Sequence, residues 1–95
     1  MPERIVTVAS RTGLHARPAK LFVQAAARQP VPVKIGVGDR EVDARSMLAV
    51  LSLGVTHGSD VTLRAEGEQA DAVLDELATL LATDLDSDQE QPVDA

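Results

Sequence analysis

A histidine and an arginine stand next to a helix-start signal near the beginning of the chain. The stretch 13–19 reads GLHARPA, so the imidazole of His15 precedes the guanidinium of Arg17 by two residues. Pro18 is compatible only with the first turn of a helix, because it has no backbone N–H to donate inside one. The pattern therefore places His15 at the N-terminal end of a helix.

The N-terminal end of a helix is a favourable place for an anion to bind. The first-turn amides of Ala16 and Arg17 lack partners inside a helix, and the Thr12 hydroxyl is near them in the chain. Arg17 also offers planar, charged donors that suit phosphate oxygens. The positive end of the helix disfavours the imidazolium form and so favours a neutral, nucleophilic His15. Together these groups predict covalent phosphorylation of a histidine.

No motif for a nucleotide donor accompanies this site. The chain has no G-x-x-x-x-G-K-[ST] loop and no cluster of carboxylates beside the helix that would bind a metal. A domain that accepts a phosphoryl group without binding its donor must receive the group from another protein, which predicts a carrier without a cofactor rather than an enzyme. The alternative is that His15 is an ordinary surface or capping residue. His57, in a turn, lacks comparable neighbours and is predicted to be exposed.

Length and composition predict one small domain. The chain has 95 residues, no cysteine and a single aromatic residue, Phe22, so disulfides and thiolate metal sites are excluded and the core must be aliphatic. No apolar run approaches the roughly 18 residues of a membrane span. The sequence also begins without a signal-peptide pattern. We therefore expect a cytoplasmic monomer without membrane insertion.

Charge is distributed unevenly along the chain. Residues 1–40 hold seven bases and two acids, residues 41–83 two bases and eight acids, and residues 84–95 five acids and no base. The first part favours anionic ligands or acidic partner surfaces. Nucleic acid is not an expected partner, because there is no basic cluster and no set of stacking aromatics. The aperiodic, acidic segment 84–95 is predicted to be a disordered tail after a domain at 1–83.

Hydrophobic periodicity predicts seven elements in the order β-α-β-β-α-β-α. Gly38 and Asp39 form a two-residue hairpin signal, and Pro30 closes the first helix. Alternating strands and amphipathic helices indicate a two-layer α+β sandwich with a four-stranded, mainly antiparallel sheet. The expected strands cover 5–9, 31–37, 40–43 and 61–66, and the expected helices cover 16–28, 47–53 and 70–81.

The short helix expected at 47–53 has more apolar residues than one buried stripe requires. Ser46 stands at its N-cap position, and Val50 and Leu53 are expected in the core. The remaining apolar side chains are predicted to form an exposed patch for protein partners, with Lys20 at its rim. This expected patch consists of Met47, Leu48 and Leu51.

Two separate stretches resemble motifs of the HPr family, the histidine-containing phosphocarriers of the phosphoenolpyruvate-dependent sugar phosphotransferase system. GLHARPA at 13–19 is similar to the phosphorylation-site motif of that family, and SMLAVLSLG at 46–54 is similar to its regulatory-serine helix. The resemblance covers about residues 3–83. It implies an open-faced β-sandwich with sheet order 1-4-2-3 and three helices on one face.

The resemblance also implies a role for each residue of these motifs. His15 would accept a phosphoryl group on Nδ1 from phospho-enzyme I and pass it to a sugar-specific enzyme IIA. Arg17 would neutralise the group, assisted by the amides of Ala16 and Arg17, and Ser46 would be the target of a regulatory serine kinase. The same fold would also suit a regulatory phosphorelay module, of the nitrogen branch or of the dihydroxyacetone-kinase branch.

Overall fold

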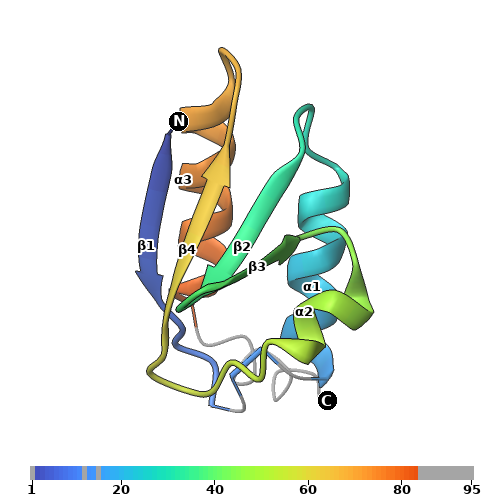
Figure 1. The fold of residues 1–95 in the computed structure, drawn as a ribbon, viewed down its shortest axis with the longest axis vertical. Coiled ribbons are helices and arrows are strands. Elements are labelled where there is room, and N and C mark those ends of the chain that lie inside the picture. Colours follow the sequence, from blue (N-terminus) through green and yellow to red (C-terminus); the bar gives the residue numbers. More distant parts are fainter. Residues whose placement is uncertain (1, 12, 15, 84–95) are drawn as a thin grey trace, which may run out of the picture.

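The computed structural model describes residues 2–11, 13–14 and 16–83. Within them the elements follow the predicted order β-α-β-β-α-β-α, which Figure 1 shows from the N-terminus in blue to α3 in orange. The elements are β1 (Glu3–Thr7), α1 (Ala16–Ala27), β2 (Val33–Val37), β3 (Arg40–Asp43), α2 (Met47–Ser52), β4 (Asp60–Ala65) and α3 (Ala70–Leu81).

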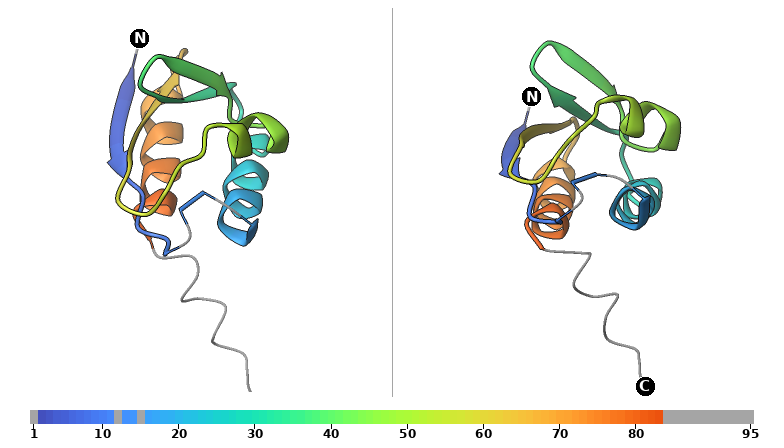
Figure 2. Two further views of the ribbon diagram at one scale, coloured as in Figure 1. Left: turned by 60° about the horizontal axis from the view of Figure 1, so that its bottom comes forward. Right: turned by 90° about the horizontal axis from the view of Figure 1, so that it is seen from below.

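The four strands form one antiparallel sheet in the order β1-β4-β2-β3. β4 is central, since Leu63 pairs with Arg4 of β1 on one side and with Ile35 of β2 on the other. Figure 2 shows α1 and α3 side by side against one face of this sheet, while α2 packs on α1 and β3. No helix of the described residues covers the other face of the sheet. The predicted α+β open-faced sandwich with sheet order 1-4-2-3 is therefore confirmed.

Alternation along the strands separates the core from the open face. Val61, Leu63 and Ala65 of β4 are buried under the helices, whereas Thr62 and Arg64 between them are partly exposed. The helices supply the other half of the core, with the buried Phe22 of α1 and an apolar stripe on α3. The buried residues of that stripe are Ala70, Val73, Leu74, Leu77 and Leu81.

The limits of several elements differ from those predicted. β1 begins at Glu3 and ends at Thr7, rather than covering 5–9, because its partner β4 begins at Asp60, opposite Thr7. β2 begins at Val33, since Pro32 has no N–H to donate to a neighbouring strand. α1 and α2 each end one residue earlier than expected, and β4 covers 60–65 instead of 61–66. The predicted tail at 84–95 lies outside the described residues.

Candidate functional site

α1 begins at Ala16, as the position of Pro18 predicts. Its first turn contains Arg17, which is exposed, followed by Pro18, which is buried. His15 precedes this helix directly in the chain, but His15 and Thr12 lie outside the described residues. The structure therefore describes the motif on both sides of His15: Gly13 and Leu14 before it, and the first turn of α1 after it.

The segment before α1 is attached to the loop between α2 and β4. The N–H of Gly13 donates to the Ser10 carbonyl at 2.9 Å, and the N–H of Leu14 donates to the Val55 carbonyl at 3.1 Å. Leu14 is buried, and Gly13 adopts the left-handed region with φ 71°. Sequence patterns did not predict the contact with Val55. The one local signal was Gly13 itself, because a glycine permits both a positive φ and close backbone approach.

The exposed side of the first turns of α1 is cationic. Arg17 and Lys20 are both exposed and three residues apart, while Ala19 and Phe22 are buried on the opposite side. Anionic groups that approach the start of α1 therefore meet two positive charges as well as the positive end of the helix.

Ser46 is the N-cap of α2, as predicted. Its backbone is extended, with φ −101° and ψ 113°, and its Oγ accepts a hydrogen bond from the Ala49 N–H at 3.3 Å. The turn before it is held by Asp43, whose carboxylate accepts from the backbone and the guanidinium of Arg45. These hydrogen bonds from Arg45 lower the pKa of the Asp43 carboxyl. The start of α2 is therefore built from local contacts that a short stretch of sequence can specify.

Replacement of Ser46 by alanine is expected to lower the free energy of unfolding by about 1 kcal/mol, because the Ala49 N–H loses its acceptor. Urea denaturation followed by circular dichroism measures the change. Ser46→Asn is the matched control, since its side-chain oxygen can still cap the helix and should preserve most of the stability. An equal loss in both variants would show that the cap is not the source of the effect.

The apolar residues of α2 divide between core and surface. Val50 is buried and Leu53 packs against the core, as predicted, whereas Leu48 is 82% exposed. Met47 and Leu51 are half-buried. We call Met47, Leu48 and Leu51 the α2 patch. The helix that holds this patch packs on α1 (Figure 2).

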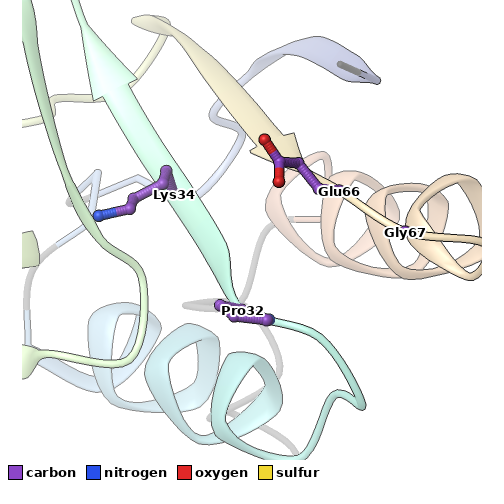
Figure 3. Close-up of a pocket in the computed structure, with 4 residues that line it drawn as sticks. All are labelled: Pro32, Lys34, Glu66 and Gly67. Atoms are coloured by element: carbon purple, nitrogen blue, oxygen red, sulfur yellow. The ribbon is translucent and has the colours of Figure 1, made fainter.

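Two open hollows lie away from the start of α1. The larger, about 550 Å³, is lined by Pro32, Lys34, Glu66 and Gly67, at the end of the sheet where β2 begins and β4 ends (Figures 1 and 3). The other, about 320 Å³, lies on the open sheet face around Gly36 and Arg64. Among the described residues, no three His, Cys, Asp or Glu side chains are grouped closely enough to bind a metal. No helix in the described ranges is long and apolar enough to span a membrane.

Comparison with known proteins shows which family this chain belongs to. A family model described as the phosphorylation site of the HPr component of the phosphotransferase system matches residues 2–83. The chain belongs to the HPr family. Membership assigns it the family function, which is to carry a phosphoryl group within that system rather than to act as a stand-alone catalyst. It also implies that its partners are other proteins of the phosphotransferase system.

Individual members of the HPr family match this chain over most of their length. The chain is 49% identical over 83 residues to phosphocarrier protein HPr of Haloferax volcanii, covering 85% of this chain and 93% of that protein. It is 48% identical over 87 residues to the HPr of Streptomyces coelicolor, covering 90% and 94%. The crystal structure of HPr from Bacillus anthracis superposes with a TM-score of 0.81 at 36% identity, covering 84% of this chain and 95% of that one.

Proposed function

We propose that His15 is the phosphoryl acceptor of this chain, that it receives the group from phospho-enzyme I, and that it passes the group to a sugar-specific enzyme IIA. The observation that carries the proposal is the start of α1 at Ala16, which makes His15 the residue before the first helical turn. The family model that matches the chain describes a phosphorylation site and includes this motif. Sugar uptake is therefore the process in which the carrier acts.

Transfer requires only one bond to form and one to break. The lone pair of the neutral His15 Nδ1 attacks the phosphorus, a new P–N bond forms, and the P–N bond to the histidine of enzyme I breaks in line with it. In the second transfer a nucleophile of enzyme IIA attacks the phosphorus, and the P–N bond to His15 breaks as the new bond forms. Positioning and charge stabilisation supply the rate, and a site that bound phosphate very tightly would hinder release to the second partner.

Four donors are available to stabilise the phosphoryl oxygens. The backbone amides of Ala16 and Arg17 are free of intrahelical partners because they lie in the first turn of α1. Pro18 has no N–H to contribute, so these two amides are the helix donors next to His15. The Arg17 guanidinium adds charge-assisted hydrogen bonds, and the Thr12 hydroxyl adds a neutral one.

Replacement of Arg17 by alanine is expected to slow phosphorylation by enzyme I about tenfold, because the developing charge loses its guanidinium partner. The side chain is exposed, so the fold should be retained. Quench-flow measurement of the phosphorylated fraction gives the rate. Arg28→Ala is the matched control, since Arg28 is an exposed cation just beyond the other end of α1. An equal slowing in both variants would assign the effect to net charge.

The surface that meets the partners combines charge with apolar contact. Arg17 and Lys20 supply cations at the start of α1, and the α2 patch supplies the exposed Leu48 beside the half-buried Met47 and Leu51. Such a surface suits an acidic partner with an apolar centre. The thioether of Met47 adapts to more than one partner, as a carrier with a donor and an acceptor requires.

Phosphorylation of Ser46 by a dedicated serine kinase would regulate this docking. The Ser46 hydroxyl stands at the start of α2, where a phosphate is favourable for the helix itself. The same phosphate would place negative charge next to the α2 patch and so oppose an acidic partner. Incubation with such a kinase and ATP, followed by kinetics with enzyme I, tests this regulation.

The function is tested by incubating the chain with enzyme I, Mg²⁺ and phosphoenolpyruvate and then measuring intact mass. One phosphoryl group that is lost in acid and maps to His15 is the expected result. Enzyme IIA domains from the sugar, nitrogen and dihydroxyacetone branches are then added separately, and the sugar-specific domain should receive the group fastest. No gain of mass, with an enzyme I that phosphorylates the HPr of Streptomyces coelicolor in parallel, would contradict the proposal.

A further inference from the structure

The C-terminal end of α2 is closed by hydrogen bonds to every one of its last carbonyls. A helix leaves four carbonyls without partners at this end. The first accepts from the Ser52 hydroxyl at 2.6 Å, and the second and third accept from the N–H groups of Leu53 and Gly54 at 3.1 and 3.2 Å. The fourth has its donor outside the helix. These carbonyls belong to Ala49, Val50, Leu51 and Ser52.

That external donor is Arg40, the first residue of β3. Its Nη1 donates to the Ser52 carbonyl at 2.8 Å, and its Nη2 donates to the Ser52 hydroxyl at 3.1 Å. The two nitrogens of one guanidinium thus hold two oxygens of one residue, in a fork that fixes orientation as well as distance. A cation at this end also interacts favourably with the negative end of the helix. We call this contact the Arg40 clamp.

The path of the chain explains why the clamp is possible. α2 runs back alongside β3 in the opposite direction, so its last turn returns toward the hairpin between β2 and β3 (Figure 1). Arg40 follows that hairpin directly, paired with Val37 at the end of the β2–β3 ladder. The clamp therefore ties the C-terminal end of α2 to the sheet, while Ser46 caps its other end.

A helix of six residues depends on such anchors. It is too short to be stable on its own propensity, and Val50 is its single fully buried residue. Leu48 of the α2 patch is almost fully exposed and so does nothing to hold the helix in place. With so little of the helix buried, the Arg40 clamp contributes to its orientation together with the packing of Val50 and of the half-buried Met47 and Leu51.

We propose that Arg40 is a positioning residue for partner docking: through Ser52 it fixes the orientation of the α2 patch relative to the first turn of α1. The inference rests on the proposed function, in which that patch and Arg17 meet the same partner. In this role Arg40 acts through Ser52 and takes no part in the chemical step. Its loss should weaken recognition of the carrier without changing the chemical step, so KM for the carrier rises and kcat stays constant.

Three variants distinguish the effect of losing the orientation of α2 from the effect of losing a positive charge. Arg40→Met removes the clamp and one positive charge, while Arg40→Lys keeps the charge but loses the fork. Arg64→Met is the matched control, because Arg64 is a cation of the same sheet whose guanidinium pairs with Glu3 at 2.7 Å and Glu41 at 3.4 Å on the open face. It removes the same charge without a contact to α2.

Hydrogen exchange tests the clamp directly and does not depend on phosphorylation. The amides that close the last turn of α2, those of Leu53 and Gly54, are expected to exchange about tenfold faster in Arg40→Met than in the wild type. In Arg64→Met they should exchange at the wild-type rate. Unchanged exchange in Arg40→Met would overturn the clamp as an anchor of α2.

Steady-state kinetics with enzyme I tests the consequence for docking. KM for the carrier should rise about fivefold in Arg40→Met, by less in Arg40→Lys, and not in Arg64→Met, with kcat equal in all. A wild-type KM in Arg40→Met, an equal rise in Arg64→Met, or a complete rescue by lysine would each overturn the positioning role. A failure of the proposed function is distinct, since wild-type protein would then gain no phosphoryl group while the exchange experiment still reports on the clamp.

Discussion

The His15→Ala variant is expected to gain no acid-labile phosphoryl group when incubated with enzyme I, Mg²⁺ and phosphoenolpyruvate. The Arg17 guanidinium and the amides of α1 can bind a phosphate, but they cannot form a bond to phosphorus, so the covalent intermediate is lost rather than slowed. The loss should be complete within the detection limit of intact mass measurement. The variant should also fold, since the core of the described residues is formed by other side chains.

His57→Ala is the matched control for this experiment, because His57 is the other histidine of the chain. It is exposed in the turn before Ser59, as predicted, and belongs to the loop that contacts Gly13. Its replacement should leave the full gain of one phosphoryl group. Phosphorylation that persisted in His15→Ala and disappeared in His57→Ala would move the acceptor to the second histidine. Thermal melting of both variants ensures that neither result reflects unfolding.

The elements that the sequence predicts best are those whose own residues contain the whole signal. α3 spans 70–81 as expected, because its buried side chains recur at helical spacing without a break. β1 begins and ends two residues earlier than expected, because the apolar run from Ile5 does not show which residues pair with β4. In the structure Ile5 is 72% exposed, whereas Arg4 points to the helix side and its guanidinium meets Asp75 of α3 at 3.0 Å. Arg4 also meets Asp71 of α3, so its partners lie 67 and 71 residues away in the chain.

The features of the candidate site also divide into those that neighbouring residues specify and those that depend on distant contacts. The cap at Ser46 and the start of α1 at Ala16 were predictable, since each depends on a few neighbouring residues. The Arg40 clamp was not, because an arginine after a hairpin gives no sign of which carbonyl it will meet twelve residues later. Contacts of this kind are determined by the packing of α2 against β3, which periodicity alone does not define.

The Gly13→Ala variant is expected to lose about 3 kcal/mol of the free energy of unfolding. A side chain at φ 71° costs about 1–2 kcal/mol, because Cβ crowds the carbonyl oxygen that follows it. The new Cβ would also lie 2.3 Å from the Val55 carbonyl oxygen and 2.6 Å from the Thr56 Cα, and both atoms are backbone. The two segments must separate, which strains or breaks the hydrogen bond from Leu14 to Val55.

Gly54→Ala isolates the first part of this cost, the backbone strain at a positive φ. Gly54 has φ 66°, close to that of Gly13, but a Cβ there would meet no heavy atom within 4 Å, so only the backbone term of about 1–2 kcal/mol applies. Urea denaturation of both variants should therefore show the larger loss for Gly13→Ala. Because Gly13 lies two residues before His15, that variant should also be phosphorylated more slowly by enzyme I under conditions where it remains folded. Equal losses of stability in the two variants would mean that the loop at Val55 yields freely, and that the segment leading into the motif is not held by it.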